Sequence, residues 1–314
     1  MRVLALAGGV GGAKLVDGLA QNLPPSDLVV VVNTGDDFEH LGLRICPDLD
    51  TVCYTLAGFA NPDTGWGRSD ESWNALESWV QLGGPDWFRL GDRDLGTHLD
   101  RTRRLRAGEP LHEVTANFCA AWGIGYQVLP MSNDPIPTRV LTGDGELAFQ
   151  EYFVRLRCQP VVRGFRFEGG DAASPAPGVL AAIRTADLVV ICPSNPWVSI
   201  DPILAVPGIR PALLEKPTLA VSPIIGGETV KGPAAKMYAE LGFEPSAYTV
   251  SKHYAGLIDG FVLDQIDRDQ ENAIQGMEIQ TLATDTWMKT IADRFRLAQE
   301  VLDFGQLLIS DKFG

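Results

Sequence analysis

The sequence predicts an α/β protein built on a mostly parallel sheet, with an inserted and mainly helical subdomain. Short, continuous aliphatic runs such as Leu28–Val32 are typical of parallel strands that are covered on both faces. A glycine-rich turn joins the first such run, Val3–Leu6, to a helical pattern at Ala13–Leu23. Strand, turn, helix and strand together make a βαβ unit, which is right-handed in nearly all proteins. We therefore expect a Rossmann-like core.

The middle of the chain is predicted to be helical. Helices are expected at Thr51–Ala57, Glu71–Gln81, Asp94–Arg106 and Leu111–Trp122. No linker divides the sequence convincingly, so we expect a single α/β domain over residues 1–314. The helical insertion would occupy about residues 50–124 and cover the active site.

Strands are expected to return after this insertion. The candidates are Tyr126–Leu129, Thr138–Thr142, Leu147–Arg155, Leu188–Cys192, Pro217–Val221 and Phe261–Asp264. The glycines at Gly143 and Gly145 predict a hairpin turn. An amphipathic helix at Thr286–Leu302 is expected to close the fold.

Composition and charge restrict the class of protein. The chain has 314 residues, and 45% hydrophobic content is enough for one large core. A formal net charge of −14 argues against a nucleic-acid partner, because binding a phosphate strand requires clustered Lys and Arg. The five cysteines form no CxxC pair, which predicts reduced, structural thiols. Neither a signal peptide nor a membrane span is expected, because glycines interrupt the first apolar run and no apolar run reaches about 18 residues, so we expect a cytoplasmic protein.

The glycine turn is a candidate phosphate site, because the N–H groups and the dipole at a helix start attract anions. Its candidate diphosphate-binding residues are Gly9, Val10, Gly11, Gly12 and Lys14. The turn is not a Walker A loop, since Leu15 follows Lys14, and it is not a complete dinucleotide fingerprint, since Lys14 takes the third glycine position. A tight turn that needs small residues for packing alone is the structural alternative.

Carboxylates cluster after the second predicted strand. Asp36 and Asp37 follow that strand, and Asp48 and Asp50 come after a short excursion. Ligands collect at the carboxyl ends of strands in open α/β sheets, and Mg²⁺ prefers oxygen ligands. We therefore predict Mg²⁺ as cofactor, with Asp36, Asp37 and Asp48 as candidate ligands. Turn formation by Asp48 and helix capping by Asp50 are the structural alternatives.

Polar residues after two later strands are candidates for a nucleotide pocket. They are Ser194, Asn195 and Gly226. Helix capping is the alternative for Ser194 and Asn195. Aromatic side chains that could stack on a flat ligand, or belong to the core, are Trp66, Trp73 and Trp87. His98 lies on a predicted helix and is expected to be structural.

Eight segments, in order, resemble the 2-phospho-L-lactate transferase family of coenzyme F-420 biosynthesis. They are Ala7–Leu15, Val32–Asp37, Cys46–Thr51, Leu90–Asp94, Pro130–Asp134, Phe149–Val154, Pro193–Pro196 and Ser222–Gly227. The resemblance covers most of the chain and weakens after about Arg268.

This resemblance implies a homodimer with a Rossmann-like core and an inserted helical region. It implies transfer of a phospholactyl, phosphoenolpyruvyl or phosphoglyceryl group from a guanosine diphosphate ester to 7,8-didemethyl-8-hydroxy-5-deazariboflavin, with release of GMP. The positions that contact the deazaflavin in that family correspond to Asp50 and Arg89, where the family often has Lys in place of Arg89. Asp50 is then the candidate catalytic residue, which orients or deprotonates the attacking hydroxyl.

Two other functions are weighed against this one. The first is a non-catalytic, nucleotide-sugar-binding regulator of the same fold, and it is disfavoured because a binder needs no hydroxyl-activating acid such as Asp50. The second is an NAD-dependent dehydrogenase, supported by Asp36 and Asp37 near a possible ribose site and weakened by the broken fingerprint. The partners expected are small-molecule substrates, and the sequence does not identify the small acid of the donor.

Overall fold

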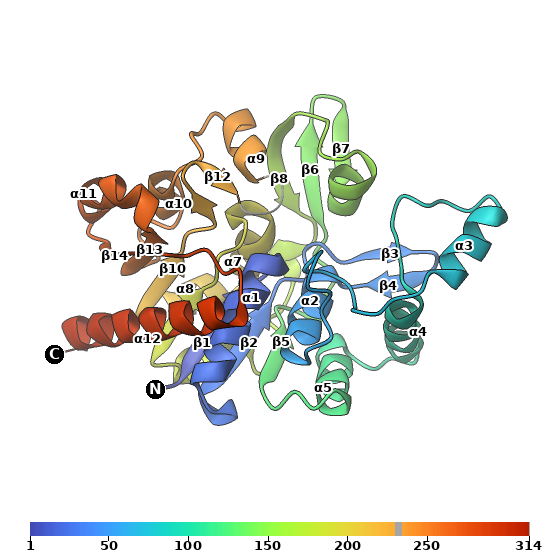
Figure 1. Cartoon of the computed structure of the whole chain (residues 1–314), viewed down its shortest axis with the longest axis horizontal. Helices are drawn as coiled ribbons and strands as arrows, with labels where there is room; N and C mark the ends of the chain where they lie inside the picture. The colour runs from blue at the N-terminus through green and yellow to red at the C-terminus, as the bar shows by residue number, and fades with distance from the viewer. Residues whose placement is uncertain (230–233, 314) are drawn as a thin grey trace.

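A seven-stranded, wholly parallel sheet forms the centre of the computed structural model, which describes residues 1–229 and 234–313 (Figure 1). Its strands stand in the order β14-β13-β10-β9-β1-β2-β5. Their bounds are β1 Val3–Ala7, β2 Leu28–Val32, β5 Gln127–Pro130, β9 Leu188–Ile191, β10 Thr218–Val221, β13 Gly260–Asp264 and β14 Gln280–Thr284. The predicted α/β class with a mostly parallel sheet is confirmed.

Helices cover both faces of this sheet. One face packs against α1 (Gly9–Asn22), α2 (Pro47–Leu56), α5 (Leu111–Ala121) and α12 (Ile291–Phe313). The other face packs against α6 (Val179–Thr185), α7 (Asp201–Ala205), α8 (Ile209–Leu213), α9 (Ala234–Glu240), α10 (Ala247–His253) and α11 (Glu271–Gln275). Successive residues of β1 alternate between the two cores, Leu4 and Leu6 facing one and Val3 and Ala5 the other. Continuous aliphatic runs arise in the inner strands β1, β9 and β10 because both of their faces are buried, whereas the edge strand β14 is partly exposed.

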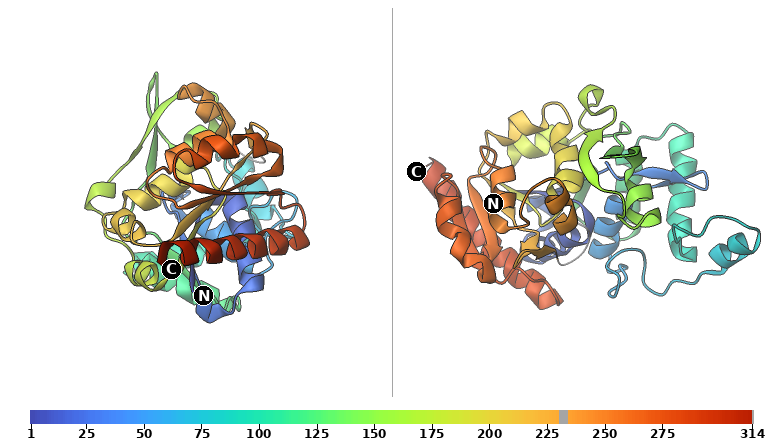
Figure 2. Two further views of the ribbon diagram at one scale, coloured as in Figure 1. Left: turned by 90° about the vertical axis from the view of Figure 1, so that its left-hand side faces the viewer. Right: turned by 90° about the horizontal axis from the view of Figure 1, so that it is seen from above.

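Smaller sheets flank the main one. The hairpin β3 (Phe38–His40) and β4 (Leu43–Ile45) leads into α2, and β11 (Ile224–Ile225) pairs with β12 (Glu228–Thr229). A three-stranded antiparallel sheet is made by β6 (Thr138–Thr142), β7 (Gly145–Ala148) and β8 (Val162–Phe167). The remaining helices are α3 (Asn74–Gln81), which projects from the body of the molecule, and α4 (Asp92–Arg106) (Figures 1 and 2).

The predicted strand at Leu147–Arg155 is wrong in its second half. Strand β7 ends at Ala148, and Glu151–Arg155 form a π-helical turn. This turn places Phe149 and Phe153 side by side in a stacked pair while Tyr152 points into a satellite core. A straight strand would have placed alternate residues on opposite faces instead.

Helix boundaries also differ from the prediction. Helix α1 starts at Gly9, so most of the glycine run belongs to its first turn, and α2 starts at Pro47, since proline is favoured at the first helical position. Helix α12 starts at Ile291, five residues later than predicted. The carboxylate of Asp293 accepts N–H bonds from Lys289 and Thr290, which caps the helix start. The hairpin β3–β4 and strand β14 were not predicted, because their short, mixed sequences carry no clear period.

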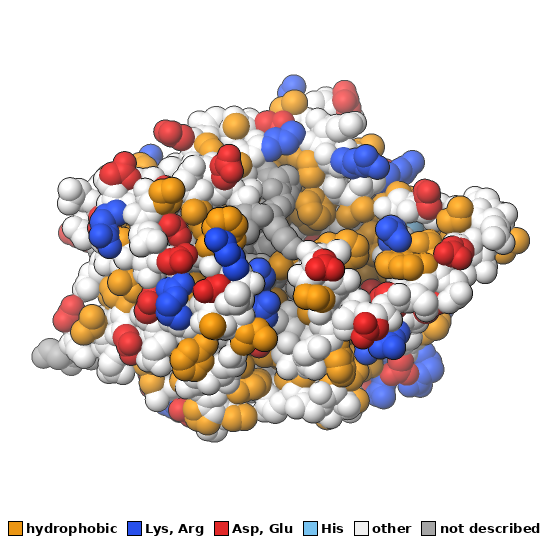
Figure 3. Space-filling model, viewed as in Figure 1, with side chains coloured by type: hydrophobic (Ala, Val, Ile, Leu, Met, Phe, Trp, Pro, Cys, Tyr) orange, Lys and Arg blue, Asp and Glu red, His pale blue; other side chains and the backbone are white. Residues whose placement is uncertain are grey.

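The strand order reverses beside β1. The chain continues from β1 to β2 and β5 on one side, and to β9, β10, β13 and β14 on the other. Ligands in open α/β sheets bind outside the carboxyl ends of strands at such a point. Among the described residues no helix is long and apolar enough to cross a membrane. Acidic and basic side chains are interspersed over the face seen in Figure 3, with no basic stripe.

Candidate active site

A cavity of about 750 Å³ opens where β1, β2, β9 and β10 end. Of the residues predicted for the site, those that line it are Gly9, Val10, Gly11, Lys14, Asp36, Asp48, Asp50, Arg89, Ser194 and Asn195. The structure thus gathers most of the predicted site from five distant segments. Gly12, Asp37 and Gly226 are not among the lining residues.

The glycines of the turn are required for close packing. A Cβ at Gly8 would stand 2.6 Å from Asp48 Oδ2, and one at Gly12 would stand 2.7 Å from Ser194 Oγ. A Cβ at Gly11 would meet the backbone oxygen of Pro193 at less than any normal contact distance. Packing therefore explains much of the glycine run by itself. It also brings the start of α1 against the segment after β9, where the first-turn N–H groups lack intrahelical acceptors.

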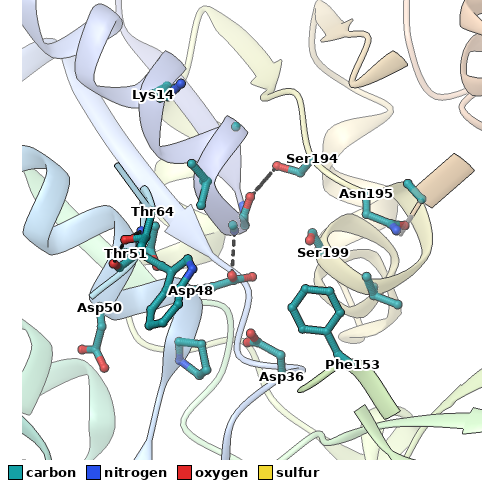
Figure 4. A pocket seen from close by; sticks show the side chains of 18 of the residues that line it. Lys14, Asp36, Asp48, Asp50, Thr51, Thr64, Phe153, Ser194, Asn195 and Ser199 are labelled. Atoms are coloured by element: carbon teal, nitrogen blue, oxygen red, sulfur yellow. Dashed lines mark hydrogen bonds between the residues drawn. The ribbon is translucent and has the colours of Figure 1, made fainter. Parts of the chain in front are cut away.

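Asp48 bridges the turn and the end of β2. Its Oδ1 accepts the N–H of Gly9 at 2.6 Å (Figure 4). Its Oδ2 accepts the side-chain N–H of Asn33 at 2.9 Å. Both donors are neutral. Burial raises the pKa of Asp48 to about 6, although these two hydrogen bonds lower it. We call Gly8–Gly11, Asp48 and Ser194 the glycine wall of the cavity.

Asp36 faces the same part of the cavity as Asp48 (Figure 4). Its Oδ2 accepts a hydrogen bond from Gln150 at 3.3 Å, and its buried Oδ1 has no partner. Burial raises the pKa of Asp36 well above its usual range, and the charges of Asp48 and Asp37 add to the rise. An unsatisfied oxygen beside a second carboxylate suits a hard divalent cation, so these residues fit Mg²⁺.

Asp37 and Gly226 lie elsewhere. Asp37 lines a neighbouring cavity of about 420 Å³ and forms an ion pair of 3.3 Å with Arg44. Burial raises the pKa of Asp37 to about 6 against the effect of Arg44. The N–H of Gly226 donates to Asp267. Neither residue faces the main cavity with Asp36 and Asp48.

Asp50 belongs to a buried charged network. Its side chain points away from Asp48 (Figure 4). Arg101 Nη1 and Nη2 donate to the two oxygens of Asp50, and Arg101 is only 2% exposed. His98 lies between two carboxylates, 3.7 Å from Asp50 and 3.3 Å from Asp94. Burial raises the pKa of Asp50, and the charges of Arg101 and His98 counter part of the rise. We call Asp50, Asp94, His98 and Arg101 the arginine wall.

Helix capping was the structural alternative for Asp50, Ser194 and Asn195. Asp50 is not the helix cap that was its alternative, since it lies in the first turn of α2 behind Cys46. Asn195 does cap, because its side chain accepts the N–H of Trp197 at 3.1 Å. Ser194 donates to the carbonyl of Gly8 at 2.7 Å, and the ammonium of Lys14 donates to the carbonyl of Met288 at 2.8 Å. In Figure 4 Lys14 lies farther along α1, away from Asp48.

Aromatic side chains line the cavity at several places: Trp66, Trp87, Phe88, Phe149, Phe153 and Trp287. Phe153 lies beside Asp36 (Figure 4). Trp87 and Phe88 contact each other, with 5.7 Å between ring centroids, and we call these two residues the aromatic part of the cavity. Arg89 stacks over the ring of Trp73, with 4.2 Å from the guanidinium carbon to the ring centroid. Trp66 is half exposed, at 50%, although it borders the cavity. Such a surface suits a planar ring system.

Several residues of the site escaped the sequence prediction. His98, Gln150 and Ser199 line the cavity, and Arg101 lies behind the lining, where it contacts Asp50. The sequence predicts a structural role for His98 and assigns no role to the other three. Arg101 follows His98 by three residues on α4, so both side chains share one helix face. That spacing, beside a predicted carboxylate site, was the available signal. Gln150 lies in the family motif Phe149–Val154, but the motif alone assigned it no role. Ser199 gave no signal, because it stands on a π-helical segment.

Solved structures share this fold. A member of the UPF0052 family from Bacillus halodurans superposes with a TM-score of 0.64 at 17% identity, covering 96% of this chain and 98% of that one. At this identity the likeness concerns the fold alone.

Relatives in sequence are much closer. A phosphoenolpyruvate transferase of Streptomyces griseus is 45% identical over 314 residues, covering 98% of this chain and 99% of the relative. The Streptomyces coelicolor protein of that name is 43% identical over 98% of each chain. The one from Thermobifida fusca is 45% identical over 90% of this chain and 91% of its own.

The family model described as 2-phospho-L-lactate transferase CofD matches residues 3–294. This range includes the glycine wall, the arginine wall and the aromatic part of the cavity. With the relatives above, the match confirms the resemblance seen in the sequence motifs. The chain therefore belongs to the CofD family of transferases, which move a phospho-acid group in coenzyme F-420 biosynthesis.

Proposed function

We propose that this enzyme transfers a phosphoenolpyruvyl group from a guanosine diphosphate ester to 7,8-didemethyl-8-hydroxy-5-deazariboflavin and releases GMP. The observation that carries the proposal is a single cavity with three distinct parts: a helix N-terminus with buried carboxylates, a charged network around Asp50, and an aromatic surface. Such a cavity is suited to a diphosphate, a reacting hydroxyl and a flat ring at the same time.

The diphosphate is assigned to the glycine wall. Backbone N–H groups at the start of α1 favour an anion there, and Ser194 fixes the turn through Gly8. The ammonium of Lys14 is directed to Met288, so the backbone is the main anion ligand in this proposal. The cap at Asn195 shapes the border of the pocket.

Asp36 and Asp48 are assigned to Mg²⁺. Their oxygens face one part of the cavity, one of them lacks a partner, and the charge of Asp48 helps to raise the pKa of Asp36. When bound, Mg²⁺ would neutralise charge on the diphosphate and on the leaving GMP. Asp37 is not included, because Arg44 already balances its charge.

The deazaflavin is assigned to the aromatic part, with Asp50 against its terminal ribityl hydroxyl and Arg89 beside the ring. The hydroxyl oxygen forms a bond to the phosphorus that carries the acid, and the bond from this phosphorus to GMP breaks. Burial raises the pKa of Asp50, which makes it a better acceptor for the hydroxyl proton. Arg101 holds the carboxylate in place through both of its oxygens.

The phosphoenolpyruvyl donor is proposed because the relatives at 42–45% identity are named phosphoenolpyruvate transferases. The dehydrogenase alternative has no support from the family. A measurement of turnover distinguishes the transferase from a non-catalytic regulator of the same fold. Homodimer formation and a cytoplasmic location stay predictions.

The test supplies the purified enzyme with deazaflavin, Mg²⁺ and one guanylated donor at a time, carrying phosphoenolpyruvate, phospholactate or phosphoglycerate. We expect the phosphoenolpyruvyl donor to give the highest kcat/KM, with GMP and the deazaflavin ester seen by chromatography and mass. A preference for another donor would reject the assigned acid, and no GMP with any donor would reject the transferase.

Asp48→Asn tests the metal assignment, with Asp37→Asn as the matched control outside the cavity. We expect Asp48→Asn to lower kcat by about 100-fold or more and to raise the Mg²⁺ concentration needed for half-maximal rate. Asp37→Asn should change the Mg²⁺ requirement little. Equal Mg²⁺ requirements in both variants would remove Asp48 from the metal site.

A further inference from the structure

Two buried thiols face each other behind the arginine wall. The sulfur of Cys53 on α2 lies 3.9 Å from the sulfur of Cys119 on α5. The side chains are 3% and 5% exposed, and both belong to the core on that face of the sheet. The two cysteines are free thiols. They are 66 residues apart in sequence, so their spacing gave no sign of this pairing.

The electrostatics of the pair are unequal. The contact between the two thiols lowers the pKa of Cys119 and raises that of Cys53. Asp50 raises the pKa of Cys53 further, while Arg101 lowers it. The pair is therefore close enough to the arginine wall to sense its charges. The thiolate is the reactive form of cysteine, and Cys119 is the better placed to supply it.

We propose that Cys53 and Cys119 form a reversible disulfide with peroxides, and that this modification lowers turnover by displacing α2. The thiolate of Cys119 attacks one peroxide oxygen, which gives a sulfenic acid and hydroxide. The sulfur of Cys53 then attacks the sulfenic sulfur, forming the S–S bond and releasing water. In total, two thiols lose two protons and two electrons, and one hydrogen peroxide becomes two waters.

Geometry links this bond to the cavity. Disulfide sulfurs are about 2.05 Å apart, so the two sulfurs must approach each other by nearly 2 Å. Part of that approach falls on α2, whose first turn carries Asp48 and Asp50. Cys53 follows Asp50 by three residues and lies on the same side of the helix. Oxidation is therefore expected to shift the bidentate contact between Asp50 and Arg101.

The first test is a peptide map of the full chain after treatment with hydrogen peroxide, followed by alkylation without reductant. We expect one linked peptide that joins Cys53 and Cys119, lighter by two hydrogens, which disappears after dithiothreitol. This measurement does not depend on transferase activity, so it stands apart from the proposed function. Separately alkylated Cys53 and Cys119, or a link to another cysteine, would overturn the proposal.

The second test follows activity in wild type, Cys119→Ala, Cys53→Ala and Cys192→Ala. Cys192 is a matched control, since it is equally buried but lies at the end of β9. We expect peroxide to lower wild-type and Cys192→Ala turnover several-fold, with recovery in dithiothreitol, and to leave both variants of the pair largely unchanged. Equal losses in all four proteins would reject the site, and a disulfide without loss of turnover would reject its coupling to α2.

Discussion

The two walls of the cavity hold carboxylates that are two residues apart on α2, yet they balance the charge in opposite ways. Asp48, on the glycine wall, accepts hydrogen bonds from neutral groups of Gly9 and Asn33. Asp50, on the arginine wall, accepts two from the guanidinium of Arg101. Burial raises the pKa of both.

Because of this difference, the Asp48 carboxylate can still bind a cation, whereas the Asp50 carboxylate is already paired with one. Neutral donors orient Asp48 without cancelling its charge, so an added divalent ion gains the full attraction. Arg101 supplies the counter-ion of Asp50, which leaves that oxygen pair suited to a hydroxyl. In the function we propose, the same helix serves two chemical tasks.

Removing the counter-ion should have the largest effect. Arg101→Met leaves Asp50 buried and uncompensated, and we expect a loss of about 3–5 kcal/mol in the free energy of unfolding. Urea denaturation measures it. The control is Arg103→Met, whose ion pair with Asp100 is on the surface and should contribute less than about 1 kcal/mol. Similar losses in the two variants would show that the arginine wall is no different from a surface pair.

Stability should also depend on pH through the glycine wall. The folded-state pKa of Asp48, about 6, is above its usual 3.8, so the folded protein binds this proton more tightly than the unfolded chain. Stability without Mg²⁺ should therefore fall as the pH rises from about 4 to about 6 and then level off, by up to about 3 kcal/mol for this group. Asp36 and Asp37 act in the same direction.

Urea denaturation across this pH range measures the slope. Saturating Mg²⁺ should flatten it, because a bound cation favours the ionised carboxylates, and Asp48→Asn should remove part of it. A slope that Mg²⁺ leaves unchanged would separate the metal from these carboxylates and break the contrast between the walls.

The smallest of the three expected effects concerns the packing of Gly11. Gly11→Ala places a methyl group against the backbone of Pro193, and we expect a loss of about 1–3 kcal/mol and a weaker hold on the diphosphate. Gly96→Ala, on the exposed side of α4, meets nothing within 4 Å and should be neutral or stabilising by up to about 1 kcal/mol. Thermal unfolding compares the two. Tolerance of alanine at Gly11 would mean that the turn relaxes more than its contacts suggest.

The sequence predicted the parts of this site that depend on strand ends. Asp36 and Asp48 were found because aliphatic runs locate strands, and parallel strands finish at one edge. Asp50 was predicted as well, but its counter-ion was missed, since Arg101 reaches Asp50 across 51 residues and only tertiary packing of α4 brings them together. Gln150 was missed for another reason: its motif alone assigned it no role, and a π-helical turn has no sequence period that a pattern of strands or helices reveals.

Gly226 and Asp37 were predicted for the site but do not line the main cavity. Both were chosen for their motif and for following a strand. Their local partners, Asp267 and Arg44, turn them to other surroundings. A sequence motif predicts roughly where a residue lies in the fold, whereas the direction of its side chain depends on partners from other elements.

Helix α12 packs against α1 (Figure 2). Gly18 allows the backbone of Arg294 to approach closely. The backbone oxygen of Met288 accepts a hydrogen bond from the ammonium of Lys14. Helix α1 is therefore held in place by residues that follow it in the sequence by more than 250 positions. A nascent chain that has not yet delivered residues 286–313 leaves one side of α1 uncovered. The glycine turn at the start of α1 is therefore synthesised well before the residues that complete its support.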